Sequence, residues 1–363
     1  MPFLIGVVSV VFAFGLVIFV HEFGHFIVAK KSGVKVERFS FGLGPELFGI
    51  QWGETRYCLA CIPLGGEVRM AGESDVENGP SAAPRDPREF FALSWYRRIP
   101  IVVAGPAMNY VLAFVLFTLI SLVWGYPHPS SEPVVGDLAE GFPAAKAGLA
   151  PGDRFLSVNG VAVSDWKSMA EKVHASAGKA LSLEVRRKDR TLSFKITPAE
   201  DKGSGRGLMG VTPVTVHERL GPAASAWRGA QQCWGWSKVT LVYLGEKIAH
   251  RQKLELSGPV GIASVLAKAA KSGMGDYLFL VALISVGIGL FNLFPIPMLD
   301  GGHLLFFLCE GIFRRPVGKR VVQAANMAGL AALLSIFLFA TYGDIQRLRT
   351  PAAPESSAST PRP

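Results

Sequence analysis

Residues 16–29 read LVIFVHEFGHFIVA and place an H-E-x-x-H motif inside an apolar run. On a helix, positions i and i+4 share a face, so His21 and His25 can hold one Zn²⁺ between them. Glu22, next to the first histidine, can serve as general base for a water at the metal. The preceding flank, Phe3 to Val20, carries no charged side chain. Because ionisable groups are costly at membrane depth, this cluster indicates a functional site rather than packing.

Composition predicts a membrane protein. Of the 363 residues, 50% are hydrophobic and 18% are charged, and the mean hydropathy is +0.33. Such values are typical of several membrane spans separated by polar segments. The net charge of +9 needs no nucleic-acid partner, because basic residues beside membrane spans explain it.

Four apolar segments are long enough to cross a membrane, and we expect spans at about 3–29, 99–124, 277–295 and 321–342. Residues 221–250 could form a fifth span, but four charged side chains lie within or beside this segment. We therefore favour an amphipathic helix at 222–249 that lies along the membrane interface.

The domain organisation follows from these spans. Short strands, glycine turns and an amphipathic helix at about 166–175 predict a small α+β domain between spans two and three. The expected parts are a first membrane part at 1–126, the α+β domain at 127–215, the interfacial helix and linker at 216–276, a second membrane part at 277–345 and a disordered tail at 346–363.

Charge bias predicts the orientation of the spans. The loop at 312–320 has four basic residues and no acidic one, which places it in the cytoplasm by the positive-inside rule. Residues 30–98 then also face the cytoplasm, and residues 125–276 face the outside. Arg347 and Arg349 in the tail argue weakly for the opposite orientation.

A catalytic zinc usually has three protein ligands, and Asp300 is the best candidate for the third. It follows a span interrupted by Pro295 and Pro297, where the helix must break. Spans one and three run in the same direction, so His21 and Asp300 fall at similar depth on the cytoplasmic side.

A second possible metal motif, Cys58-x-x-Cys61, lies in a predicted strand. Positions i and i+3 of a strand face opposite ways, which argues against a metal shared by the two cysteines.

These motifs resemble the site-2 protease family of intramembrane zinc metalloproteases. The resemblance rests on the H-E-x-x-H motif of the first span and on Leu299-Asp300-Gly301-Gly302 at the third. Segments at 41–45, 62–66, 105–109 and 292–302 also match the bacterial branch typified by the regulator of sigma-E protease. The resemblance implies a polytopic α-helical membrane protein with four transmembrane helices, a membrane-associated β-hairpin and an inserted α+β PDZ domain.

The family resemblance also implies roles for single residues. His21, His25 and Asp300 would bind Zn²⁺, and Glu22 would deprotonate the water and later protonate the leaving amine. Asn292 would orient the substrate or stabilise the oxyanion, or else form an interhelical hydrogen bond at the broken helix.

Three further positions keep two readings each. Asn109 is either an interhelical hydrogen-bonding residue or a support for the site. His303 could lie in the outer shell of the metal or, as the less favoured alternative, bind it directly. The family's β-hairpin matches residues 53–70, where Gly65 and Gly66 would allow a substrate backbone to approach; the alternative is an ordinary surface hairpin.

The segment at 144–160 resembles a bacterial PDZ module, with Pro-Gly-Asp and Asn-Gly turns flanking a strand. PDZ modules can capture a peptide C-terminus, and in this family they also act as a size filter. We find one module, where the typical enterobacterial protein has two in tandem.

The resulting hypothesis is an intramembrane zinc endopeptidase of the bacterial inner membrane, with the PDZ domain in the periplasm. It would contact lipid and cleave single-pass transmembrane substrates, such as an anti-sigma factor or remnant signal peptides. The alternatives are a catalytically silent membrane scaffold with a peptide-binding PDZ module, which an intact Glu22 disfavours, and a zinc transporter. A transporter would need a polar path through several spans, but only spans one and three supply ionisable groups.

Overall fold

The computed structural model describes residues 2–72, 86–201, 205–250, 252 and 258–349. The chain forms two compact units. The first combines the described residues up to Val123 with those from Gly221 onward, and the second is Trp124–Leu220. Each unit has its own core and is described by itself.

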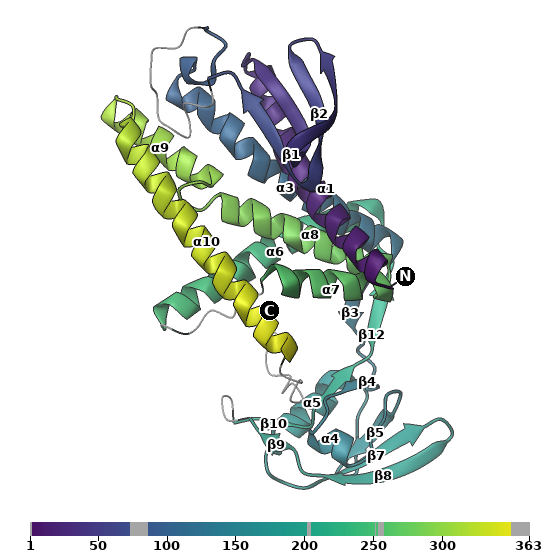
Figure 1. Cartoon of the computed structure of the whole chain (residues 1–363). Helices are drawn as coiled ribbons and strands as arrows, with labels where there is room; N and C mark the ends of the chain where they lie inside the picture. The colour runs from purple at the N-terminus through teal and green to yellow at the C-terminus, as the bar shows by residue number, and fades with distance from the viewer. Residues whose placement is uncertain (1, 73–85, 202–204, 251, 253–257, 350–363) are drawn as a thin grey trace. The chain divides into compact units, whose positions relative to one another are not determined.

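The elements of the first unit are drawn in Figure 1. They are α1 (Pro2–Lys31), β1 (Val36–Trp52), β2 (Thr55–Met70), the 3₁₀ helix η1 (Phe90–Ala92), α3 (Trp95–Val123), α6 (Pro222–Ala249), α7 (Pro259–Ser272), α8 (Met274–Asn292), α9 (Asp300–Phe313) and α10 (Lys319–Arg349).

Within the described ranges, four helices are long and apolar enough to cross a membrane: α1, α3, α8 and α10. They coincide with the four predicted spans, each longer or shorter by a few residues. The predicted interfacial helix is α6, which is not among these four. Buried small and apolar side chains such as Ala13, Val17 and Ala113 pack α1, α3 and α8 against one another.

Strands β1 and β2 form an antiparallel hairpin with several register irregularities. The sequence predicts short strands here, whereas the structure has two long strands, and residues 38–41 of β1 pair with both 56–59 and 66–69 of β2. Phe19, Phe23 and Phe26 of α1 pack on Phe39 of β1. The hairpin exposes the apolar side chains of Leu47, Phe48, Ile50 and Trp52. Cys58 is buried and Cys61 is exposed, so the two thiols face opposite ways as predicted.

The third span ends earlier than predicted. Helix α8 stops at Asn292, and α9 begins at Asp300. The seven intervening residues (293–299) include Pro295 and Pro297, and Met298 has a positive φ of 78°. Prolines cannot donate the hydrogen bonds that would continue the helix. Asn292 and Asp300 therefore lie at the two ends of a helix break.

Helix α10 is hydrogen-bonded to the start of α7. The Asp344 carboxylate accepts from the backbone N–H groups of Gly258 and Gly261 at 3.1 and 2.7 Å. Because α10 continues to Arg349, the prediction of a disordered tail from residue 346 is wrong for residues 346–349. The remainder of that predicted tail, 350–363, lies outside the described residues.

The second unit is an α+β structure around a four-stranded antiparallel sheet in the order β6-β5-β7-β8. Apolar side chains alternate along β7 and pack with α5 around Phe155 and Met169. The elements are β3 (Tyr126–Pro129), β4 (Val135–Leu138), α4 (Pro143–Lys146), β5 (Arg154–Val158), β6 (Val161–Ala162), α5 (Trp166–His174), β7 (Leu181–Arg187), β8 (Arg190–Ile196), β9 (Ala199–Glu200), β10 (Gly207–Leu208), β11 (Val211–Pro213) and β12 (Thr215–Glu218).

The borders of this unit differ slightly from the predicted 127–215. Strand β12 pairs with β3 through His217↔Pro127 and Glu218↔Tyr126, which extends the unit at both ends. Helix α5 begins where predicted, because the Asp165 side chain accepts from the Ser168 N–H at 2.8 Å and caps it.

Candidate zinc site

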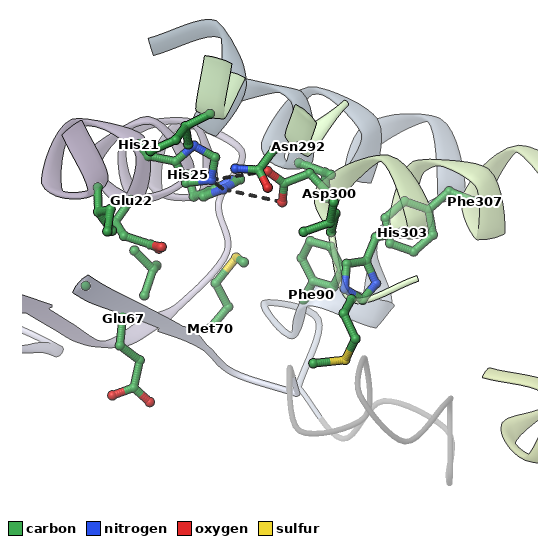
Figure 2. A pocket seen from close by; sticks show the side chains of 17 residues that line it. His21, Glu22, His25, Glu67, Met70, Phe90, Asn292, Asp300, His303 and Phe307 are labelled. Carbon is green, nitrogen blue, oxygen red and sulfur yellow. Dashed lines mark hydrogen bonds and ion pairs between the residues drawn. The ribbon is translucent and has the colours of Figure 1, made fainter. Parts of the chain in front are cut away.

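His21, His25 and Asp300 meet at one point inside the first unit. Their ligand atoms all lie within 4.8 Å of one another. His21 Nε2 lies 3.2 Å from Asp300 Oδ2, and His25 Nε2 lies 3.6 Å from Asp300 Oδ1. Figure 2 shows the three side chains turned toward one another, with Asn292 beside them. The site thus joins one turn of α1 to the first residue of α9.

The donor set fits a zinc ion. The two imidazole Nε2 atoms face each other at 3.2 Å, a contact that lone pairs on both would make repulsive without a cation between them. Asp300 Oδ2 is buried, and no described residue donates a hydrogen bond to it. A shared cation would satisfy all three donors, and two imidazoles with one carboxylate form a common catalytic zinc set.

His25 is held in the form that a metal ligand needs. Its Nδ1 lies 2.8 Å from the Ile101 carbonyl oxygen on α3. Only a protonated Nδ1 can donate to a carbonyl, so in the neutral ring Nε2 keeps its lone pair. The backbone of α3 therefore fixes both the orientation and the tautomer of this histidine.

Glycine at position 105 makes room for the two imidazoles. A Cβ added at Gly105 would lie 2.2 Å from His25 Nε2 and 2.8 Å from His21 Nε2. On the opposite helix, a Cβ at Gly24 would lie 2.3 Å from the Ala104 carbonyl oxygen. Helices α1 and α3 therefore cross closely at the site, and no larger residue fits at either glycine.

A cavity of about 550 Å³ opens beside the three candidate ligands. Glu22 and Asn292 line it together with Gly66 of the hairpin and His303 of α9. Figure 2 shows Glu22 apart from the ligand group, on the side of α1 that faces the cavity. A Cβ at Gly66 would lie 2.7 Å from Glu22 Cγ, so the hairpin backbone passes directly over this carboxylate-bearing side chain.

The structure brings together six of the seven predicted site residues, namely His21, Glu22, His25, Asn292, Asp300 and Gly66. Gly65 is the exception, because it does not line the cavity. Its φ is 153°, and a Cβ there would lie 2.6 Å from Leu43 Cγ. Gly65 thus turns the hairpin backbone, a role that a residue with a side chain would strain.

Sequence reasoning missed two contributors from α3. The Ile101 carbonyl carries no signal in a single sequence, because any residue supplies the same backbone oxygen. Gly105 stands beside Pro106 and four residues before Asn109, and this grouping could have directed attention to α3. The need for a glycine at position 105 becomes clear only from the close crossing of α3 and α1.

Comparison with known proteins places the chain in a family. The sequence pattern of Peptidase family M50 matches residues 9–336. A protein of Mesorhizobium japonicum that carries the name of a zinc metalloprotease is 34% identical over 365 residues, covering 94% of this chain and 99% of the relative. Zinc metalloprotease RasP of Geobacillus kaustophilus is 29% identical, in an alignment that covers 94% of this chain and 98% of the relative.

The regulator of sigma-W protease RasP of Bacillus subtilis is 28% identical, again over 94% of this chain and 98% of the relative. Among solved structures, the PDZ domain of the SdrC-like protein from Listeria monocytogenes covers 24% of this chain at 21% identity, with a TM-score of 0.21.

The family match spans both helices that carry the ligands, from the H-E-x-x-H motif of α1 to Asp300 of α9. Relatives that cover nearly the whole chain are named zinc metalloproteases. The chain therefore belongs to peptidase family M50, the site-2 protease family, and is a zinc metalloprotease.

Proposed function

We propose that this protein is an intramembrane endopeptidase that cleaves the transmembrane segments of single-pass proteins. The observation that carries this proposal is the position of the ligands within α1, one of the four apolar helices. His21 lies roughly 15 Å from the end of α1 at Lys31, at 1.5 Å per residue. In a hydrocarbon core of about 30 Å, the scissile bond would be cut below the membrane surface.

The residues of the site have separate roles in metal binding, proton transfer and stabilisation of the carbonyl oxygen. His21, His25 and Asp300 would hold zinc, which would polarise the scissile carbonyl and acidify a water molecule when bound. Glu22 accepts the proton of that water and returns it to the leaving amine. Asn292, the last residue of α8, donates its side-chain N–H to the carbonyl oxygen as that oxygen gains negative charge.

The hairpin offers the substrate a strand to pair with. Gly66 and Val68 pair with Phe41 and Phe39 of β1 on one side, and both also line the cavity. A locally unwound substrate segment can pair with this backbone and pass over Glu22. Because Gly66 has no side chain, the peptide comes close to Glu22 without a clash.

The second unit acts as a single periplasmic PDZ domain in this proposal. A cavity of about 330 Å³ lies between α5 and the segment from Gly207 to Thr212, which suits a peptide C-terminus.

The cytoplasmic side of the protein would carry the hairpin, whose exposed Phe48, Ile50 and Trp52 would contact lipid of the bacterial inner membrane. Substrates would be anti-sigma factors or remnant signal peptides that a first external cut has shortened, as in regulated intramembrane proteolysis.

A catalytically silent scaffold is the alternative. Glu22 disfavours it, because this base lines the same cavity as three converging ligands. A scaffold whose only task is to bind peptides has no use for that arrangement.

The test uses the full chain in liposomes with a single-pass substrate that lacks its outer domain. We expect native protein to cut within the apolar segment, as mapped by mass spectrometry. Glu22→Gln should retain zinc and lose cleavage by roughly 10²- to 10⁴-fold, the usual contribution of general acid–base catalysis. Undiminished cleavage by Glu22→Gln, or cuts confined to residues outside the apolar segment, would refute the proposal.

A further inference from the structure

The Asn109 side chain of α3 lies directly behind the first zinc-ligating histidine. Asn109 is completely buried, and its Nδ2 lies 3.1 Å from His21 Nδ1. Its other amide atom, Oδ1, is also buried, and no described residue donates to it. A buried amide oxygen without a donor is costly, so the arrangement calls for an explanation.

The placement of the amide as it stands conflicts with metal binding. If Nδ2 donates to His21 Nδ1, that nitrogen must carry a lone pair, and the ring proton sits on Nε2. His21 Nε2 is the atom that faces His25 Nε2 and Asp300 Oδ2. A proton there would block the lone pair that a zinc ion needs.

A half-turn of the amide removes the conflict. The oxygen and nitrogen of an amide are nearly the same size and exchange places with almost no movement of other atoms. Oδ1 then accepts from the Nδ1–H of His21, and the Nε2 lone pair points at the other two ligands. His25 already has this arrangement with the Ile101 carbonyl.

We propose that Asn109 is a positioning residue for zinc, whose side-chain oxygen accepts from His21 Nδ1–H and so fixes the tautomer and ring orientation of this ligand. The proposal rests on the proposed role of His21 as a zinc ligand. Helix α3 then orients both histidines. The backbone oxygen of Ile101 accepts a hydrogen bond from His25, and the side-chain oxygen of Asn109 accepts one from His21.

The contact between α3 and α8 does not account for the amide. Ser285 of α8 donates to the backbone oxygen of Asn109 at 2.8 Å, and a Cβ at Gly289 would lie 3.2 Å from Asn109 Cβ. Helix α8 therefore packs on the main chain and Cβ of Asn109. The amide itself is directed to α1 and His21.

The test is the zinc dissociation constant of the full chain in detergent, measured by competition with a chromophoric chelator. Asn109→Leu keeps the volume and removes the acceptor, so zinc affinity should fall roughly 10- to 100-fold, as for other outer partners of metal-bound histidines. Asn109→Asp restores an oxygen acceptor and should bind zinc within a few-fold of native protein. Ser285→Ala removes the neighbouring interhelical hydrogen bond and serves as the matched control, with affinity near that of native protein.

Native affinity in a folded Asn109→Leu protein would overturn the proposal, and so would an Asn109→Asp protein as weak as Asn109→Leu. A second measurement needs no variant: in zinc-free native protein labelled with ¹⁵N at the histidine rings, NMR should show at least two rings protonated at Nδ1. Fewer than two such rings would also overturn it.

His21→Ala distinguishes the role of His21 as a ligand from the role of Asn109 as its positioning residue. Native zinc affinity in His21→Ala would refute His21 as a ligand. Lost affinity in His21→Ala together with native affinity in Asn109→Leu would refute only the role of Asn109.

Discussion

Arg98 of α3 donates to the Glu310 carboxylate of α9, with 2.5 Å between Nη2 and Oε1. The Arg98 side chain is 3% exposed and lies over the rings of Phe91 and Phe307, at 5.1 and 4.6 Å from their centroids. This pair joins the helix that carries Ile101 and Gly105 to the helix that begins with Asp300. It therefore links the two helices that contribute to the candidate zinc site.

Breaking this pair should weaken both the fold and zinc binding. Arg98→Met leaves the Glu310 charge without its partner, and we expect a loss of about 3 kcal/mol in the free energy of unfolding. Zinc affinity should fall as α9 shifts. The double variant Arg98→Met with Glu310→Leu should recover much of the stability, because it removes the unpaired charge. Denaturant unfolding checks this, and an Arg98→Met protein as stable as native would contradict it.

A single methyl group at position 105 should disable the metal site. The Cβ of Gly105→Ala would lie 2.2 Å from His25 Nε2, so the imidazole must leave its position beside His21 and Asp300. We expect most of the zinc to be lost and the protein to be destabilised by about 1–3 kcal/mol through overpacking. Gly287→Ala is the matched control in α8, since a Cβ there meets no atom within 4 Å. Equal zinc content in the two variants would show that the site tolerates the added carbon.

Stability of the second unit should depend on pH through Asp153. Burial alone would raise the pKa of this carboxyl, but hydrogen bonds from the Arg187 side chain and the Ala150 N–H outweigh it and lower the pKa below its ordinary value of 3.8. Arg187 Nε and Nη2 each donate at 2.7 Å. Because the folded pKa is below the unfolded one, the stabilisation is complete above about pH 4 and is lost as the pH falls through the folded pKa.

Asp153→Asn should therefore destabilise this unit by about 2 kcal/mol at neutral pH, the usual worth of hydrogen bonds to a charged group. The difference from native protein should shrink below about pH 4. Hydrogen exchange of residues 154–196 in the full chain, followed by mass spectrometry, measures this. The exposed Asp189 supplies the control, as Asp189→Asn should change stability by less than about 0.5 kcal/mol. A gap between Asp153→Asn and native protein that does not narrow at all as the pH falls below 3.8 would argue against the pH dependence.

The three candidate zinc ligands could be grouped from the sequence because their signals are local. His21 and His25 share a helix face by spacing alone, and Asp300 follows prolines that must end a helix. The support around them could not be predicted in the same way. Which carbonyl of α3 meets His25, and why position 105 must be glycine, depends on where two helices cross.

The same reasoning explains the other differences. The pairing of β12 with β3 joins residues about ninety positions apart, so the borders of the second unit could not be read from local turns. The pairing of residues 38–41 of β1 with two separate segments of β2 cannot be read from local alternation. The position of Gly66 over Glu22 is a consequence of that pairing.

Zinc content per chain tests the central claim most directly. We predict about one zinc per chain for native protein and for Glu22→Gln, since His21, His25 and Asp300 are intact in both. Asp300→Ala leaves two imidazoles and should retain far less zinc after the same purification, as measured by elemental analysis. An Asp300→Ala protein with the zinc content of native protein would contradict the assignment of this carboxylate as the third ligand.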